Sequence, residues 1–124
     1  LMCLANGSSF VEDTVYLDRF SHIAELNRLG ASIDLKKNIA IINGSKELFG
    51  TNVMSTDIRA SASLVIAALA SHGVTKLSRI YHIDRGYENM ESKLQKLSVD
   101  IIRNNDWNTL LQKIGIKSLY ILKK

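Results

Sequence analysis

Two short polar segments carry the residue types that anion chemistry needs, and each stands where a strand pattern gives way to a helical pattern. The first is Ser-Thr-Asp-Ile-Arg at positions 55–59. Ser, Thr and Asp are favoured at helix N-caps, and the helix dipole stabilises an acidic residue there by roughly 0.3–1 kcal/mol, so Asp57 could be purely structural. The functional alternative is that Arg59 and the free N–H groups of the helix N-terminus bind a carboxylate or a phosphate.

The second segment, Tyr-His-Ile-Asp-Arg-Gly-Tyr-Glu at positions 81–88, contains the adjacent residues Asp84 and Arg85. A surface ion pair between these two side chains would contribute little stability. The same Asp-Arg pair occurs at Asp18 and Arg19, after an earlier strand pattern. Because ligand sites in α/β proteins favour strand ends, two arginines in these positions could face one shared anionic ligand.

The histidines and the single cysteine lack the spacing of a metal site, so we expect neither a metal ion nor another cofactor. His22 falls in a helical pattern. His72 precedes Gly73, where a cation would complement the end of a helix. Cys3 lies in an apolar segment, and nothing nearby in the sequence would activate its thiol, which favours a structural role.

These candidate residues must be positioned by alternating strands and helices. Strand patterns occupy positions 9–14, 33–35, 39–42, 51–55, 74–80 and 99–103, and helical patterns occupy positions 20–29, 59–71 and 87–97. The Lys-Lys-Asn sequence at 36–38 indicates a hairpin, and Gly30 and Gly73 are placed to end two of the helices. The predicted fold class is therefore α/β.

The chain contains an internal repeat. Gly7 and Gly73 are 66 positions apart, as are the two Asp-Arg pairs, and three apolar residues of each half match at a spacing of 68: Leu26, Leu29 and Ile33 with Leu94, Leu97 and Ile101. Each copy reads as a glycine, a strand, Asp-Arg, a helix and a second strand. Repeated units of this kind pack together to close one core. The first copy lacks the opening strand and most of the helix that precede Gly73 in the second, which indicates a truncated array.

Composition narrows the class of protein. The chain has 124 residues, 46% hydrophobic and 23% charged, with 16 basic and 12 acidic side chains, and this length allows one domain at most. The net charge of +4 is scattered and lacks an aromatic–basic stacking pattern, so no nucleic-acid partner is expected. The longest apolar run, at 64–70, is far short of the ~20 residues that cross a bilayer, so no membrane association is expected. One cysteine and no signal-peptide pattern favour a cytoplasmic setting.

Two long motifs in this order give the chain a specific resemblance. Asp-Ile-Arg-Ala-Ser-Ala-Ser at 57–63 and Ile-Tyr-His-Ile-Asp-Arg-Gly-Tyr-Glu at 80–88 resemble the UDP-N-acetylglucosamine 1-carboxyvinyltransferase family of enolpyruvyl transferases. Thr-Val-Tyr-Leu-Asp-Arg-Phe at 14–20 is similar to the preceding repeat of that family. The resemblance covers residues 1–104 and implies an incomplete inside-out α/β barrel built from repeats. Residues 105–124 match nothing in the family and are expected to form a tail, with a helix at 107–114 and a strand at 117–122.

The resemblance also implies an activity and a role for each site residue. Members transfer enolpyruvate from phosphoenolpyruvate to the 3-hydroxyl of UDP-N-acetylglucosamine, the first committed step of peptidoglycan synthesis, on which cell wall biogenesis, cell shape and cell division depend. By resemblance, Arg85 contacts the phosphate of phosphoenolpyruvate and Asp57 exchanges protons at the reacting carbon. The implied substrate-binding residues are Arg19 and Arg59 on the enolpyruvyl anion, Val15 on the UDP-sugar through its backbone, and His82 beside the anion site.

Several features of the family are absent or altered in this sequence. The family's substrate-contacting Lys-Asn pair, its mobile cysteine loop and its second catalytic Asp would all lie before residue 1, and Cys3 does not match the loop cysteine. We therefore expect a C-terminal part of the enzyme that needs the missing N-terminal portion as its partner and does not turn over alone. Within the matched region, Asp18 stands where the family has Asn, Ala24 where it has Pro, and Ser98 where it has Gly.

Two other functions remain open from the sequence. A 3-phosphoshikimate 1-carboxyvinyltransferase would share the barrel and the phosphoenolpyruvate chemistry but accept a different hydroxyl substrate. A non-catalytic anion-binding or scaffold module of two repeats would need neither Arg85 nor Asp57 for its role. Such a module would be stable alone, whereas part of a barrel would expose unpaired strand edges and tend to aggregate.

Overall fold

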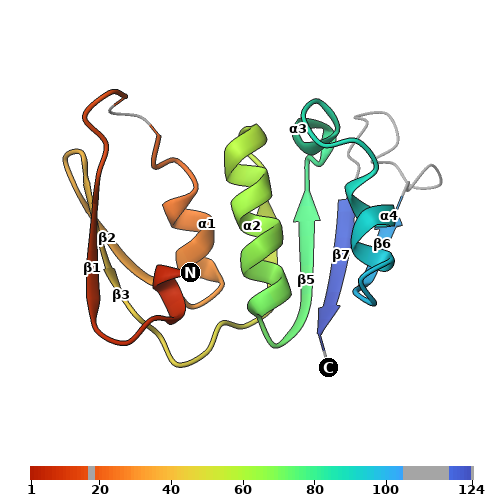
Figure 1. The fold of residues 1–124 in the computed structure, drawn as a ribbon, viewed down its shortest axis with the longest axis horizontal. Coiled ribbons are helices and arrows are strands. Elements are labelled where there is room, and N and C mark those ends of the chain that lie inside the picture. The colour runs from red at the N-terminus through yellow and green to blue at the C-terminus, as the bar shows by residue number, and fades with distance from the viewer. Residues whose placement is uncertain (17–18, 105–117, 124) are drawn as a thin grey trace.

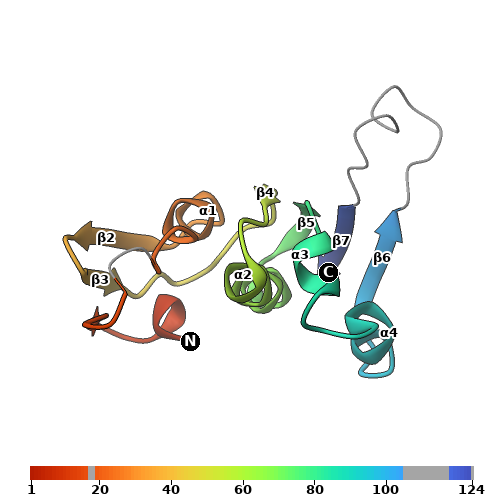
Figure 2. The same cartoon turned by 90° about the horizontal axis from the view of Figure 1, so that it is seen from above.

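The computed structural model describes residues 1–16, 19–104 and 118–123, which fold into two sheets with a long helix between them (Figures 1 and 2). This arrangement confirms the predicted α/β class. The elements in chain order are the 3-10 turn η1 (Met2–Leu4), β1 (Ser8–Glu12), α1 (Ile23–Arg28), β2 (Ser32–Lys36), β3 (Ile39–Asn43), β4 (Asn52–Met54), α2 (Ile58–Ala70), β5 (Gly73–Ser78), α3 (Tyr81–Asp84), α4 (Met90–Gln95), β6 (Asp100–Asn104) and β7 (Ser118–Lys123).

The first sheet has the strand order β1-β3-β2, and β3 is antiparallel to both neighbours. Strands β2 and β3 form the hairpin that the sequence predicts. Lys37 in its turn has φ 55, the left-handed conformation that two-residue hairpin turns require. Ile33 and Ile42 face each other across the two strands and are both buried. The alternation of apolar and polar residues thus sets the register of this sheet.

The second sheet has the strand order β4-β5-β7-β6. Strands β4 and β5 are parallel and are joined through α2, which is the usual connection for a parallel pair. Strand β7 is antiparallel to both β5 and β6 and lies between them, and Ile121 of β7 is 1% exposed. The strand predicted at 117–122 is therefore confirmed as an interior strand. The helix predicted at 107–114 lies outside the described residues.

The two sheets repeat one arrangement. In each, two parallel strands flank an antiparallel third, which follows them in the chain: β3 between β1 and β2, and β7 between β5 and β6. The side-chain amide of Asn27 donates to the carbonyl of Ile33 at 2.8 Å, and Gln95 donates to Ile101 at the same distance. These bonds connect α1 to β2 and α4 to β6, respectively. The internal repeat is thus confirmed, and β7 is the counterpart of β3.

Two helices are shorter than the sequence predicts, and one was not predicted. The pattern at 20–29 forms a helix from Ile23 only, and the pattern at 87–97 forms a helix from Met90 only. Asn89 has φ 48, and this left-handed residue separates α4 from the turn before it. The short helix α3 occupies Tyr81–Asp84, where the sequence indicated only a strand-to-helix junction.

Helix α2 lies between the two sheets, and its buried side chains pack toward the elements on both sides of it (Figure 2). Ala60, Leu64, Ala67 and Ala68 recur at helical spacing and are buried, and the small alanines allow close approach of the neighbouring elements. Leu29 of the first repeat and Ile80 of the second belong to the same apolar cluster and are fully buried. Among the described residues, no helix is long and apolar enough to span a membrane.

A helix end gives the first testable prediction, because the two repeats differ there. Gly30 has φ 95 after α1, and its counterpart after α4, Ser98, has φ 62. A left-handed conformation is strained for serine but not for glycine, so Ser98→Gly should raise the free energy of unfolding by about 0.5–1 kcal/mol. Urea unfolding of the full chain measures this difference. The control is Ser92→Gly inside α4, which should instead destabilise by a similar amount; stabilisation by both variants or by neither would contradict the account.

Candidate functional site

The candidate residues gather at one edge of the molecule, the upper edge in Figure 1, where β1 and β5 end and where α1 and α2 begin. Two contacts tie these segments together. Ser21, just before α1, donates through Oγ to Oδ2 of Asp57 at 3.4 Å. A Cβ added to Gly86 would lie 2.9 Å from Cγ2 of Ile58, so the segment after Arg85 packs directly on the first turn of α2. The structure therefore brings both predicted polar segments and the loop before α1 to one place.

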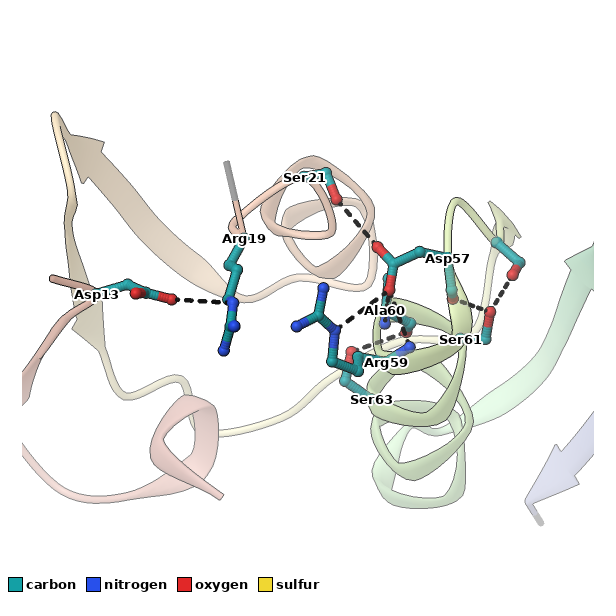
Figure 3. A network of polar contacts seen from close by, with 9 residues as sticks. Asp13, Arg19, Ser21, Asp57, Arg59, Ala60, Ser61 and Ser63 are labelled. Atoms are coloured by element: carbon teal, nitrogen blue, oxygen red, sulfur yellow. Dashed lines mark hydrogen bonds and ion pairs between the residues drawn. The ribbon is translucent and has the colours of Figure 1, made fainter. Parts of the chain in front are cut away.

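Asp57 is the N-cap of α2, as its sequence context predicts. Its Oδ1 accepts hydrogen bonds from the backbone N–H groups of Arg59 at 2.9 Å and Ala60 at 3.0 Å (Figure 3). These bonds, led by the one from Ala60, lower the pKa of the Asp57 carboxyl below its ordinary value. Asp57 is consequently a carboxylate at neutral pH, and within the described part of the chain its Oδ2 accepts only the long bond from Ser21. The cap role and an acid–base role are compatible, because they use different oxygens.

The cap gives a second prediction, in which the alanine and the asparagine variants of Asp57 separate the hydrogen-bond acceptor from the charge. Asp57→Ala removes the acceptor and should lower the free energy of unfolding by about 1 kcal/mol, whereas Asp57→Asn keeps an acceptor but loses the charge and should lower it by less. Because the folded-state pKa is depressed, the charge stabilises the fold above the ordinary value of 3.8 and this contribution is lost as the pH falls through the folded value. Urea unfolding at several pH values should show wild type converging on Asp57→Asn in acid, and a constant difference between them would contradict the assignment.

Arg59 and Arg19 extend toward one another from α2 and from the loop before α1 (Figure 3). The Arg59 side chain is 67% exposed, and its Nε lies 4.0 Å from Oδ1 of Asp57, so the ion pair between them is weak. Arg19 places Nε 3.6 Å from Oδ2 of Asp13 and its guanidinium 4.8 Å from the ring centre of Tyr16. Two like charges directed at one region favour an anion between them.

Asp13 is a member of this site that the sequence did not reveal. Its Oδ1 accepts from the backbone N–H groups of Val15 and Tyr16, both at 2.9 Å, and the bond from Tyr16 contributes most to lowering the pKa of this carboxyl. Aspartate commonly forms such a turn after a strand, and the position of Asp13 directly after the strand could have predicted this turn from the sequence. Since the N–H of Val15 is occupied, a backbone contact of Val15 with a sugar would use its carbonyl. The predicted neighbour of Arg19, Asp18, lies outside the described residues.

Asp84 and Arg85 do not form the surface pair that the sequence suggested. Asp84 instead receives a bidentate pair from Arg103 of β6, with Nη1 at 3.2 Å from Oδ2 and Nη2 at 2.6 Å from Oδ1. Arg103 can present both of its terminal nitrogens to the two oxygens of Asp84, whereas the adjacent side chains of Asp84 and Arg85 cannot adopt this bidentate geometry as well. Within residues 1–16, 19–104 and 118–123, Arg85 has no ion-pair partner, and its side chain is exposed.

The remaining polar candidates have supporting positions. His82 is half-buried in α3, and its ring centre lies 4.2 Å from that of Tyr81. His22 is half-buried, and burial lowers its pKa despite the nearby Asp57 carboxylate, so its ring is neutral at pH 7. Cys3 is partly buried against the core. In the part of the chain that the structure describes, no group of three or more His, Cys, Asp or Glu side chains could hold a metal ion.

Buried serines stiffen the first turns of α2 behind the site. The hydroxyl of Ser61 donates to the backbone carbonyl of Asp57 and contacts the hydroxyl of Ser55, and both serines are fully buried (Figure 3). Ser63 donates to the carbonyl of Ala60 at 2.8 Å. The serines of the motif at 57–63 therefore bond within the helix, and the functional groups left to solvent are those of Asp57 and Arg59.

Comparison with known proteins places these features in a family. A sequence model of the family described as EPSP synthase (3-phosphoshikimate 1-carboxyvinyltransferase) matches residues 1–94. The UDP-N-acetylglucosamine 1-carboxyvinyltransferase of Pelodictyon phaeoclathratiforme is 58% identical over 103 residues, which are 83% of this chain and 24% of that protein. The protein of the same name from a Sulfurovum species is 50% identical with the same coverage. The chain thus spans about a quarter of the length of the curated relatives that it matches.

Solved structures agree with the fold. The enolpyruvyl transferase NikO from Streptomyces tendae superposes with a TM-score of 0.71 at 33% identity, covering 76% of this chain and 22% of that one. EPSP synthase from Acinetobacter baumannii gives a TM-score of 0.63 at 15% identity, covering 98% of this chain and 26% of that one, and this likeness concerns the fold alone.

Proposed function

The chain belongs to the EPSP synthase family of enolpyruvyl transferases, and from this premise we propose that it supplies one anion-binding edge of a UDP-N-acetylglucosamine 1-carboxyvinyltransferase. The proposed reaction transfers enolpyruvate from phosphoenolpyruvate to the 3-hydroxyl of the UDP-sugar and releases phosphate. We further propose a cytoplasmic setting and a place in peptidoglycan synthesis. Residues 1–104 would be the part shared with the barrel of the relatives, and residues 105–124 a divergent end that contributes β7.

One observation carries this proposal: a carboxylate and several arginines converge at one edge while their guanidinium groups are weakly paired or free. Among the described residues, Arg59 has only the weak pair with Asp57 and Arg85 has no ion pair. Phosphoenolpyruvate carries a phosphate and a carboxylate, so it needs several cations held apart on rigid elements. Arginines that already had strong carboxylate partners would not serve this purpose.

The proposed roles follow from the chemistry of the transfer. A new bond forms between the 3-hydroxyl oxygen and the carbon that loses phosphate, so the hydroxyl must lose its proton and the phosphate must depart with its charge stabilised. Arg85 would hold the phosphate, and Arg59 and Arg19 would hold the carboxylate. Asp57 is ionised and can accept a proton through Oδ2, the oxygen that does not cap the helix. Val15 would contact the UDP-sugar and His82 would border the anion site.

Sequence identity supports UDP-N-acetylglucosamine as the hydroxyl substrate. The relatives at 50–58% identity carry that substrate in their name, whereas the solved structures of EPSP synthase are alike in fold only. Because the chain spans about a quarter of those relatives, we propose that residues from outside this segment complete the site. The chain alone is then expected to release no phosphate when given both substrates.

A chimaeric enzyme tests the proposal. The segment of the Pelodictyon phaeoclathratiforme enzyme that matches this chain is replaced by this chain's residues, and phosphate release is measured with phosphoenolpyruvate and each hydroxyl substrate. Release that depends on UDP-N-acetylglucosamine is the expected result. A soluble, folded chimaera without this activity, when the parent enzyme is active under the same conditions, would overturn the proposal. The remainder of the chimaera comes from an enzyme named for UDP-N-acetylglucosamine. Phosphate release with shikimate 3-phosphate would therefore have to come from this chain's residues and would contradict the assigned substrate.

A further inference from the structure

Arg103 holds two carboxylates from two different helices. Besides the bidentate pair with Asp84 of α3, its Nε lies 3.0 Å from Oε1 of Glu91 in α4, and its Nη2 lies 3.1 Å from Oε2 of Glu91. The Arg103 side chain is only 21% exposed. The hydrogen bonds that Arg103 donates, above all those to Asp84, raise its pKa further above the ordinary value, so it stays charged. One guanidinium thus ties α3 and α4 to β6.

The pair with Arg103 determines whether the Asp84 carboxylate, next to Arg85, is paired or free. Asp84 precedes Arg85 in the chain, and an unpaired carboxylate there would compete for the Arg85 guanidinium and repel an anionic ligand. The pair with Arg103 occupies both oxygens of Asp84, at 3.2 and 2.6 Å. Arg85 is left without an ion-pair partner among the described residues.

The first repeat lacks such a residue. By the spacing of 68, the counterpart of Arg103 is Leu35, whose apolar side chain is exposed. There Arg19 itself has a carboxylate partner, Asp13 at 3.6 Å. The two repeats therefore present their arginines differently: the cation of the first repeat is partly neutralised, and that of the second is free.

We propose that Arg103 is a positioning residue, which binds Asp84 and thereby keeps Arg85 free to hold the anionic substrate. The proposal rests on the function proposed above for Arg85. It assigns no contact between Arg103 and substrate, since Arg103 reaches the site only through Asp84 and the helix α3. This role could not be predicted from local sequence patterns, because Arg103 and Asp84 are 19 residues apart.

The first part of the test needs no ligand. The NMR signal of the Arg85 Nε–Hε group is recorded in the full chain for wild type, Arg103→Met and the double variant Arg103→Met with Asp84→Asn. In Arg103→Met the freed Asp84 should pair with Arg85 and shift this signal, and Asp84→Asn should reverse the shift. A signal that does not move overturns the proposal, and so does a shift that Asp84→Asn leaves in place. If Arg103 only held the helices in position, removing the charge of Asp84 would not reverse the effect of losing Arg103.

Two further variants control this comparison. Arg103→Lys keeps the charge without the fork and should give a smaller shift, and it serves in place of Arg103→Met if circular dichroism shows that the latter is unfolded. Arg28→Met removes an exposed arginine at the far end of α1 and should leave the Arg85 signal unchanged. A shift of equal size in Arg28→Met would count against a specific link between Arg103 and Arg85.

The second part titrates phosphoenolpyruvate into the chimaeric enzyme, without substitutions (wild type) and with the same substitutions. Arg103→Met should weaken binding roughly three- to tenfold, and Asp84→Asn in that background should restore most of the loss. Equal affinity in wild type and Arg103→Met overturns the proposal. If the ligand-free shifts occur as expected but wild type shows no binding, the anion site proposed for Arg85 fails while the positioning role of Arg103 stands.

Discussion

Asp57→Asn and Arg85→Ala should each lower phosphate release by the chimaeric enzyme by about a hundredfold or more, because each removes a group that we propose acts on the reacting atoms. Asp57→Asn is informative because the amide retains an acceptor for the N–H groups of Arg59 and Ala60, and therefore retains the helix cap. The loss should appear in kcat, measured by steady-state phosphate release. Arg85→Ala should raise the KM for phosphoenolpyruvate as well, since the side chain is proposed to hold its phosphate.

The matched control for these variants is Arg28→Ala. Arg28 is exposed in the last turn of α1, and its Nη1 lies 3.6 Å from Oε1 of Glu25, so its loss should change neither activity nor stability by much. Activity within twofold of wild type in Asp57→Asn and Arg85→Ala would contradict their proposed roles. That outcome would favour the alternative of a non-catalytic module, for which neither side chain is required.

Leu64→Ala should lower the free energy of unfolding by about 2–5 kcal/mol, the largest effect on stability that we expect from a single truncation. Leu64 is 1% exposed in α2, between the two sheets, and belongs to the one apolar cluster that joins both repeats. Truncation leaves a cavity that rigid neighbours on both sides cannot fill. The total free energy of unfolding of a small domain is only about 5–15 kcal/mol, so urea unfolding should show a large fall in the transition midpoint.

Ile66→Ala is the control on the same helix. Ile66 is 64% exposed, so removing the same kind of side chain two positions away should change the free energy of unfolding by no more than about 0.5 kcal/mol. Similar losses for the two variants would mean that the cluster around Leu64 does not hold the repeats together. A loss confined to Leu64→Ala supports the packing described for α2.

Local signals predicted much of the fold and part of the site. The N-cap at Asp57, the hairpin around Lys37 and the glycine at Gly30 each depend on a few neighbouring residues, and each has the predicted structure. The repeat was visible because the same local signals recur at nearly constant spacing. It also explains the C-terminal strand: β7 takes the place that β3 has in the first repeat, although a longer connection hides this in the sequence.

Contacts between distant segments could not be predicted in the same way. Arg103 binds Asp84 and Glu91 because β6 returns beside α3 and α4, whereas the sequence pattern placed Arg103 only at the end of a predicted strand. Asp13 was missed because its role depends on the path of the chain to Arg19. The structural alternative for Asp84, a surface pair with the adjacent Arg85, does not form for the same reason, since the better partner comes from β6.

A crystal structure of the chimaeric enzyme with phosphoenolpyruvate bound tests most directly whether the proposed edge holds the anion. This is the edge where α2 begins, bordered by the loop before α1 and by the end of α3. We predict that the phosphate lies within hydrogen-bonding distance of the Arg85 guanidinium and that Arg59 or Arg19 contacts the carboxylate. An anion bound with none of these three arginines in contact would contradict it.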